Sequence, residues 1–374
     1  MKRALHIILL FSILLGFGII FYQDYFPVIQ EEPLKGYSPP FEKATFSWEK
    51  WWSGEYQERK DVELTNVFGF RNTLVRLDHQ IGWTVFRSAH VNGVIVGEED
   101  YLYEESYINA YYGKDYIGDS LLLQRMEKVK MVSDTLSKLG KELIIVFAPG
   151  KATFYDEYIP KNLIAEKRKT NYAQHKKYAE DWGLNFVDFQ SWFLEIKDSS
   201  THSLYPKYGI HWSYYGAALA QDSLIRYIEK LRNIDMPNAS IQDYSVDTLK
   251  KTDFDIGASL NLLEPLDNET HTFPFIIWES EEGKQKPTMV TIADSFYWLF
   301  IDQGFTRGFD NSQFWYYYHD IYPATSRGFK KHADLILSEE IANHDIFIIM
   351  STDANLSKLG WDFIEESYDL FYKK

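Results

Sequence analysis

Short apolar runs alternate along this chain with segments in which apolar residues recur at helical spacing. The runs "ELIIVFAP", "LNFVDF" and "DIFIIMS" are typical of strands buried on both faces. Between them, the residues from Leu121 to Leu139, the segment "NYAQHKKYAEDWG" and the residues from Tyr214 to Arg232 have the spacing of helices. Strands separated by helices predict an α/β fold, with a largely parallel sheet and helices on both faces.

The N-terminus has a different pattern, an almost unbroken apolar run from Ala4 to Tyr22. Its length suits a membrane-spanning helix, which needs about 20 apolar residues. No small-x-small cleavage site follows, so we expect residues 1–22 to be an uncleaved signal anchor, with a cleaved signal peptide as the alternative. Because Lys2 and Arg3 precede the run, residues 4–22 would anchor the chain with its N-terminus in the cytoplasm and the rest outside.

The remaining chain divides into a linker and one large domain. Residues 23–64 are polar and contain Pro and Trp, which is typical of a membrane-proximal linker. We expect a single catalytic-type domain over residues 65–374, within which residues 233–285 form an irregular insertion. Within that domain, "VNGVIVGEEDYLYEE" predicts two short strands around a turn from Gly97 to Asp100.

Charge and composition exclude several classes of function. The formal net charge is −15 and no Lys/Arg cluster stands out, so a nucleic-acid partner is not expected. The chain has no cysteine, which excludes disulfides, thiolate catalysis and Cys-ligated metals. Its histidines lack metal-ligand spacing, so we predict no metal, and nothing implies a cofactor.

The stretch "VTIADSFYWLF", residues 290–300, is the first candidate site. Val290 to Ala293 predict a buried strand, and Asp294 and Ser295 follow at its carboxyl end, where open α/β sheets bind ligands. Ser295 could be a nucleophile or only the N-cap of the helix that follows. A nucleophilic serine requires a base, usually a histidine oriented by a carboxylate.

Two other segments could complete such a site. In "GIHWSYYGA", His211 lies at a loop-to-helix junction where Ser213 is a plausible N-cap, although an ordinary capping-region histidine would look the same. In "VFAPGKATFYDEYIP", a strand ends at Gly150 and Lys151. Gly150 would allow close backbone approach to a ligand, and Lys151 would hold a polar substrate group or pair with Asp156.

Five blocks in this order resemble the AlgX/AlgJ-type SGNH hydrolase-like family, related to the DHHW proteins. They are "FGFRNTLVRLDHQI", "VNGVIVGEEDYLYEE", "VFAPGKATFYDEYIP", "GIHWSYYGA" and "IADSFYW", within a match over roughly residues 65–365. The resemblance implies a flavodoxin-like SGNH fold with His before Ser in the chain. It also implies an extracytoplasmic O-acetyltransferase of exopolysaccharides, with Ser295 as nucleophile, His211 as base and Asp294 as the neighbour of Ser295 in its block.

The sequence departs from the family's Asp-x-His-Trp pattern, because Gly209 stands two residues before His211. A carboxylate from elsewhere could orient His211, with Asp188, Asp253 or Asp255 as candidates. Alternatively, a Ser–His dyad could act with a backbone carbonyl, or the protein could be a catalytically impaired polysaccharide-binding subunit. An esterase that delivers the acyl group to water would use the same residues as a transferase.

Further residues are expected around the site. Asn355 and Thr352 follow the last strand and could donate to an oxyanion, or fix a surface turn; backbone N–H groups near Ser295 are the alternative donors. The aromatic residues Trp212, Tyr214, Trp298 and Trp315 are candidates for stacking on sugar rings. The resemblance implies a polysaccharide acceptor and an acetyl donor supplied by a multi-spanning membrane O-acyltransferase. The expected location is the cell membrane, single-pass, with a periplasmic catalytic domain.

Overall fold

The computed structural model describes residues 2–36, 40–249, 251–266, 269–325 and 328–373. The chain forms two compact units, which are described separately. One contains residues 1–92 together with 257–267, and the other contains residues 93–256 and 268–374. Residues 65–92, which the sequence assigned to the large domain, therefore group with the N-terminal part.

The smaller unit is helical. Its first helix, α1 (Lys2–Tyr25), is long and apolar enough from Arg3 to Tyr25 to cross a membrane, by length and composition only. The chain continues through α2 (Trp48–Ser53), α3 (Glu55–Asn66) and α4 (Arg71–Ile81). Residues 23–64, expected to be a membrane-proximal linker, thus contain α2 and most of α3.

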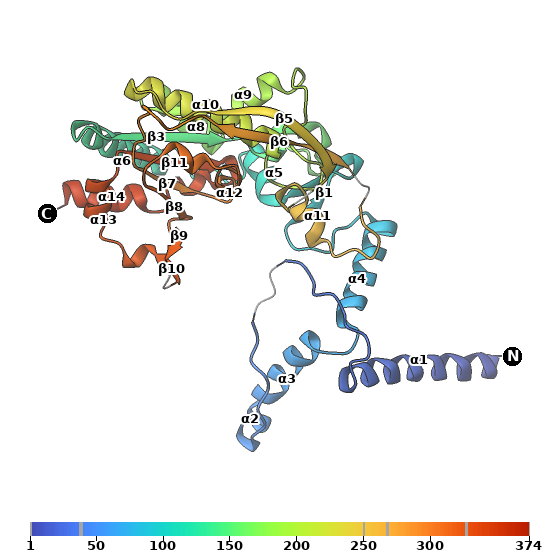
Figure 1. Ribbon diagram of the computed structural model, residues 1–374. Helices are drawn as coiled ribbons and strands as arrows, with labels where there is room; N and C mark the ends of the chain where they lie inside the picture. Colours follow the sequence, from blue (N-terminus) through green and yellow to red (C-terminus); the bar gives the residue numbers. More distant parts are fainter. Residues whose placement is uncertain (1, 37–39, 250, 267–268, 326–327, 374) are drawn as a thin grey trace. The chain divides into compact units, whose positions relative to one another are not determined.

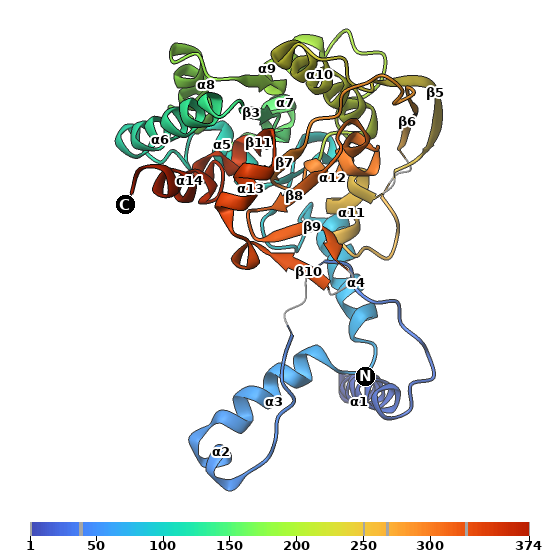
Figure 2. The same cartoon turned by 60° about the vertical axis from the view of Figure 1, so that its left-hand side comes forward.

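The larger unit is built on a seven-stranded sheet (Figures 1 and 2). In spatial order its strands are β10 (Gly328–Lys331), β9 (Asp320–Thr325), β8 (Ser312–Tyr316), β7 (Met289–Ala293), β11 (Ile346–Thr352), β3 (Glu142–Ala148) and β4 (Phe186–Asp188). The five strands from β8 to β4 are parallel, which confirms the expected core of the sheet. The edge strands β9 and β10 are antiparallel, so the sheet is mixed there.

Alternating residues of the central strands enter two cores. In β3, Leu143, Ile145 and Phe147 pack with α6 (Asp119–Lys138), α8 (Asn171–Asp181), α13 (Leu337–Asn343) and α14 (Phe363–Tyr372). The other side of β3 contacts α9 (Phe189–Ile196), and α10 (Tyr214–Arg232) packs against α12 (Tyr297–Asp302). Because both faces are covered, β3, β7 and β11 are apolar almost throughout, as the sequence indicated.

Capping residues fix where several of these helices begin. The Ser213 hydroxyl accepts a hydrogen bond from the Gly216 N–H, and α10 runs from Tyr214 to Arg232 as expected. Asp188 caps α9 in the same way through the Ser191 N–H. The remaining helices of this unit are α5 (Glu105–Tyr111), α7 (Lys151–Phe154) and the start of α11 (Asp255–Ser259).

Two antiparallel pairs lie outside the main sheet. The predicted strands around Gly97 are β1 (Val94–Val96) and β2 (Leu102–Glu104). The expected irregular insertion, residues 233–285, instead contains the paired strands β5 (Ala239–Thr248) and β6 (Thr270–Trp278), of which β6 packs along α10. The segment between β5 and β6 is the part of this region that reaches the site.

Candidate active site

Three side chains from distant segments meet at the carboxyl end of β7. The Nε2 atom of His211 lies 2.8 Å from the Ser295 Oγ, and its Nδ1 atom lies 2.6 Å from the Asp255 Oδ2. With the Asp255 carboxylate accepting the Nδ1–H, Nε2 is the free acceptor for the Ser295 hydroxyl proton. This is the geometry of a nucleophile, a base and an orienting carboxylate.

Ser295 does not cap the helix that follows it. Helix α12 begins at Tyr297, and no side chain caps its N-terminus. The Ser295 hydroxyl is directed to His211 instead, and the residue is partly exposed. Of the two roles that the sequence allowed, the geometry supports the nucleophile.

Asp255 is the orienting carboxylate, among three candidates. Its Oδ1 accepts hydrogen bonds from the Ile210 N–H at 3.0 Å and the Ile256 N–H at 2.7 Å, which leaves Oδ2 for His211. Asp188 is occupied as the cap of α9. Asp253 is fully buried with no hydrogen-bond partner among the described residues, and burial, together with the Asp255 charge, raises its pKa to about 8. The three side chains are therefore arranged like a catalytic triad despite Gly209.

The absence of a side chain at Gly209 leaves room for the segment that carries Asp255. A Cβ atom at Gly209 would lie 2.4 Å from the Thr252 carbonyl oxygen and 2.8 Å from the Asp253 carbonyl group. Such distances are far inside van der Waals contact, so any side chain at position 209 would displace the 3₁₀ turn η5 (Lys251–Phe254) that leads into Asp255. The glycine that departs from the Asp-x-His-Trp pattern is thus also the residue that allows Asp255 to reach His211.

Asp294 braces the turn that carries the nucleophile. Its buried carboxylate accepts hydrogen bonds from the Thr352 N–H and hydroxyl, both at 2.9 Å, from the Asn355 amide at 3.0 Å and from the Phe296 N–H at 3.1 Å. Because β11 lies beside β7, Thr352 at the end of β11 and Asn355 in the turn after it reach this carboxylate, whereas Phe296 belongs to the turn of Ser295 itself. Thr352 and Asn355 therefore bind the Asp294 carboxylate, a positioning role in place of the expected oxyanion contact.

Lys151 holds the loop that precedes His211. Its side chain is fully buried, and its Nζ donates to the Lys207 carbonyl at 2.7 Å and the Gly209 carbonyl at 2.6 Å. Burial lowers the pKa of Lys151 to about 7, against the opposing effect of the Asp255 carboxylate. Neither expected role, substrate contact or pairing with Asp156, fits a side chain enclosed in this way.

Gly150 is needed for packing against a carboxyl group, not against a ligand. A Cβ there would lie 1.9 Å from the Asp353 Oδ1. Asp353 is itself buried, accepts a hydrogen bond from the Thr153 hydroxyl at 2.6 Å, and has its pKa raised by burial to about 7. The expected ligand approach at Gly150 is therefore wrong.

Of the four aromatic residues proposed for sugar stacking, two are buried in the core and two are partly exposed. Trp212 is fully buried and stacks on Phe300 with centroids 5.2 Å apart, and Trp315 is fully buried with its Nε1–H on Gln313. Both are core residues, so their assignment to sugar stacking was wrong. Tyr214 is partly exposed and packs on Phe273, and Trp298 lines a small apolar cavity of about 250 Å³ with Phe314 and Tyr322.

Two residues near the triad were missed by the sequence analysis. Tyr317 follows β8, and its N–H donates to the carbonyl of Ala293, two residues before Ser295, at 3.0 Å. Glu104, at the end of β2, lies near the triad, where desolvation and the Asp255 charge raise its pKa. In the sequence Tyr317 lies in an aromatic run, and Glu104 lies at the second of the two strands predicted around Gly97 to Asp100. Neither pattern indicates proximity to Ser295.

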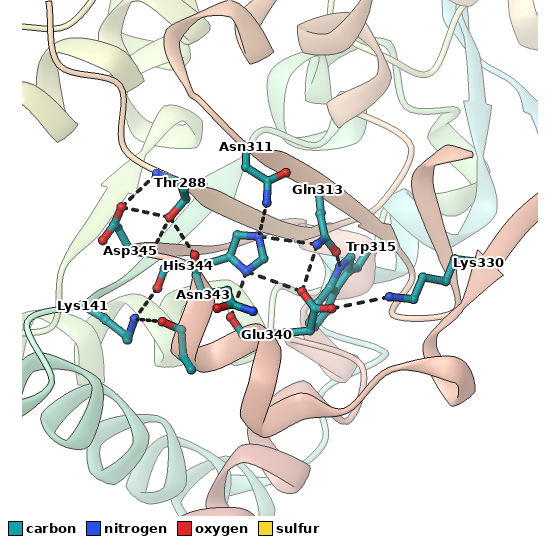
Figure 3. Close-up of polar contacts among 11 residues, drawn as sticks. Lys141, Thr288, Asn311, Gln313, Trp315, Lys330, Glu340, Asn343, His344 and Asp345 are labelled. Carbon is teal, nitrogen blue, oxygen red and sulfur yellow. Dashed lines mark hydrogen bonds and ion pairs between the residues drawn. The ribbon is translucent and has the colours of Figure 1, made fainter. Parts of the chain in front are cut away.

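A second buried histidine lies at the opposite, amino end of the sheet (Figure 3). The Nδ1 of His344 lies 2.8 Å from the Glu340 carbonyl oxygen, and its Nε2 lies 3.2 Å from the Asn311 amide nitrogen. Nearby, Asp345 accepts from the Thr288 N–H and hydroxyl, both at 2.9 Å. Among the described residues, neither this cluster nor any other groups three or more His, Asp or Glu side chains in a way that could hold a metal ion.

The chain is similar in sequence to proteins of one known family. The sequence model of the SGNH hydrolase-like domain of the acetyltransferase AlgX matches residues 94–281, half of the chain. These residues include His211 and Asp255 and end before Ser295. A probable alginate O-acetylase AlgJ of Pseudomonas putida is 22% identical over 138 residues, which are 37% of this chain and 34% of that protein. The match thus spans about a third of that relative's length.

Solved structures with a similar arrangement have low sequence identity. The O-acetyltransferase domain of Pseudomonas putida AlgJ is 13% identical, with a TM-score of 0.47, and the match covers 74% of this chain and 99% of that one. Bacillus cereus PatB1 with a sulfonyl adduct is 13% identical, with a TM-score of 0.49, over 72% and 99% of the two chains. Pseudomonas aeruginosa AlgX is 14% identical, with a TM-score of 0.46, over 73% and 66%.

Proposed function

Since the chain belongs to the AlgX family of SGNH hydrolase-like acetyltransferases, we propose that it is a polysaccharide O-acetyltransferase acting through an acetyl-serine at Ser295. The observation that carries the proposal is the continuous contact from Asp255 through His211 to Ser295. It supports catalytic competence over an impaired binding subunit, because the carboxylate missing at Gly209 is supplied by another segment.

In the first half of the reaction, the Ser295 Oγ attacks the carbonyl carbon of an acetyl ester while His211 Nε2 takes its proton. The tetrahedral intermediate collapses, and the donor's alcohol leaves with the proton from His211. This yields acetyl-Ser295. The Asp255 carboxylate stabilises the imidazolium that forms between these proton transfers.

In the second half, a sugar hydroxyl takes the place of the leaving alcohol. Its oxygen attacks the acetyl carbon while Nε2 accepts its proton, and Ser295 leaves and recovers a proton from His211. One ester bond is broken and one is formed, so the reaction needs no cofactor. Water in the acceptor position would release acetate, and an esterase would use the same residues.

The test is product analysis with the full chain in detergent micelles, an activated acetyl ester and an oligosaccharide acceptor. We expect acetylated oligosaccharide to form, and S295A and H211A to abolish it. Acetate release without acetylated sugar would replace the transferase with an esterase. No acetyl-Ser295 and no turnover would overturn both.

We also propose that α1 remains as a single-pass anchor and that the catalytic unit acts outside the cytoplasm, where a multi-spanning membrane O-acyltransferase would supply acetyl groups. The apolar helix from Arg3 to Tyr25 and the preceding positive charge support this orientation. Protease digestion of intact spheroplasts should remove the catalytic unit; its full protection would contradict the orientation.

A further inference from the structure

A cleft of about 550 Å³ lies in the larger unit, formed by the turn after β8, the start of α14 and part of α6. Its volume is in the range of roughly 300–1,000 Å³ that small-molecule sites occupy. Tyr317 and Trp361 form an aromatic corner in its wall, with ring centroids 5.3 Å apart and planes at 80°. Both rings are partly exposed. Such rings offer flat apolar faces of the kind that pack against the C–H face of a pyranose.

Tyr317 links this cleft to the nucleophile. It lines the cleft, and its N–H donates to the carbonyl of Ala293, two residues before Ser295, at 3.0 Å. Its side chain is also near enough to Ser295 for the two to interact electrostatically. None of the three triad residues lines the cleft, so Tyr317 is the connection: a ligand held against the aromatic corner would be separated from Ser295 by this side chain. The small apolar cavity beside Trp298 has a different lining.

The backbone around the cleft is held in an uncommon conformation. Tyr317 and Tyr318 have φ values of 50° and 56°, and Trp361 and Asp362 have 44° and 81°, all in the left-handed region. All four residues line the cleft. Bulky residues rarely adopt this conformation, and where they do they are often at ligand sites. Here the two strained turns present the Tyr317 and Trp361 rings.

The charges of the cleft indicate which saccharides it would accept. Its carboxylates are Asp362, Glu365 and Glu366, and its permanent cations are Arg125 and Lys358. Arg125 is engaged, because its Nη1 donates to the Ser357 carbonyl at 2.6 Å and its Nε lies 3.7 Å from the Glu365 carboxylate. Glu366 accepts a hydrogen bond from the Tyr318 hydroxyl at 2.8 Å and lies 3.0 Å from the His332 Nε2. Among the described residues, Lys358 and Asp362 are the lining charges outside these contacts. The whole chain carries a net charge of −15. A polyanionic chain would be repelled from such a surface, whereas sugar hydroxyls can donate to its carboxylates.

We propose that this cleft binds the acetyl acceptor and that the acceptor is a neutral polysaccharide, with a sugar ring on Trp361 and a hydroxyl directed to Ser295. The inference rests on the proposed function for the acetyl step, but its binding half can be tested without catalysis.

The first test is binding of a cellohexaose and a mannuronate hexamer to the full-length S295A protein in detergent micelles, by calorimetry. Cellohexaose should bind and the mannuronate hexamer should bind at least about tenfold more weakly, since three carboxylates line the cleft and the chain carries a net charge of −15. W361A should remove cellohexaose binding, and W361F should retain most of it. Equal or tighter binding of the mannuronate hexamer would overturn the charge argument, and unchanged binding by W361A would overturn the location.

Trp182 is the matched control, because it also lies partly exposed against the same hydrophobic core but has no place in the cleft. W182A should bind cellohexaose like the S295A parent. In addition, D362N removes one carboxylate at a left-handed position that Asn tolerates. It should tighten mannuronate binding about two- to fivefold and leave cellohexaose unchanged; the absence of that shift would contradict the role of charge.

The second test separates this inference from the proposed function. In the catalytically intact protein with an activated acetyl ester, W361A should form acetyl-Ser295 within about twofold of the wild-type rate, while transfer to cellohexaose falls at least about tenfold. No acetyl-Ser295 in the wild type would refute the proposed function and leave the binding result to decide the cleft. Normal transfer by W361A would refute the cleft alone.

Discussion

The two ends of the central sheet each hold a buried histidine with both ring nitrogens in contact, but the partners differ. At the carboxyl end, His211 lies between a carboxylate and the hydroxyl of the partly exposed Ser295. At the amino end, His344 lies between a backbone carbonyl and the Asn311 amide, with the Glu340 carboxylate 3.5 Å from Nδ1 (Figure 3). Burial and a nearby acid are common to both sites.

The two sites differ in whether the histidine has a partner from which it can accept a proton. His211 can accept a proton from a hydroxyl that reaches the surface of the unit, and Asp255 stabilises the resulting charge. The partners of His344 are a backbone carbonyl and an amide that tie α13 to the starts of β8 and β11, and none of them is a nucleophile. A histidine is assigned a catalytic role here by its partners and not by its burial.

The same substitution at both histidines should separate these roles most strongly. H211N should lower turnover of an activated acetyl ester by about 10³–10⁵-fold with little loss of stability. H344N should leave turnover within about twofold and lower the free energy of unfolding by about 1–3 kcal/mol, because buried polar partners lose their contacts. Rate measurements and denaturant unfolding of both variants check this. Equal losses of turnover would remove the distinction.

Replacing the orienting carboxylate should have the next largest effect. D255N should lower turnover by about 10²–10⁴-fold, because the amide cannot stabilise an imidazolium as a carboxylate does. D253N is the control. Asp253 is buried without a partner, and its pKa of about 8 keeps it protonated at neutral pH, so the amide should leave turnover nearly unchanged. A larger loss of turnover in D253N than in D255N would show that Asp255 is not the orienting carboxylate.

Filling the space at Gly209 should impair the triad indirectly. In G209A the new Cβ must push away the Thr252 carbonyl, and with it the turn that carries Asp255. We expect turnover to fall about 10- to 100-fold, since misplacement by an ångström costs about that much. In G308A, the control, the nearest atoms lie at 3.7 Å and the activity should persist. Full activity of G209A would show that Asp255 does not depend on this gap.

The smallest effect on turnover is expected at Asp353, where the change should be in stability alone. Burial raises the pKa of Asp353 to about 7, from an ordinary value near 3.8, so the folded state retains a proton that the unfolded state releases between about pH 4 and 7. The wild type therefore loses stability relative to D353N over this range, by on the order of 4 kcal/mol, and the difference is constant above pH 7. Unfolding curves of both proteins from pH 4 to 8 measure it. A pH-independent difference would contradict the shift.

The sequence predicted the parts of this structure that local patterns encode. Helix α10 was located by its apolar spacing and by Ser213, and β7 by its apolar run before Asp294. Ser295 and His211 followed from the order of the family blocks. The order of His211 before Ser295 and the α/β architecture were likewise predicted from these patterns, and the fold confirms the architecture.

Asp255 could be named only as one of three candidates, because its role depends on a long-range contact. It reaches His211 from a region that lacks regular periodicity, through a gap created by a glycine 46 residues earlier in the chain. Lys151 was misassigned for the same reason: a lysine after a strand is usually exposed, and only the fold shows that backbone carbonyls surround this one. Trp361 was missed because two strained turns, not a motif, bring it beside Tyr317.

The most direct test of the account is the rate at which Ser295 becomes acetylated. Full-length wild-type, D255N and S295A proteins would be mixed with an activated acetyl ester, quenched at short times and analysed by intact mass and peptide mapping. The account predicts rapid formation of one acetyl group on Ser295 in the wild type, formation at least about 10²-fold slower in D255N, and none in S295A. Acetylation of D255N at the wild-type rate, or an adduct that persists in S295A, would contradict it.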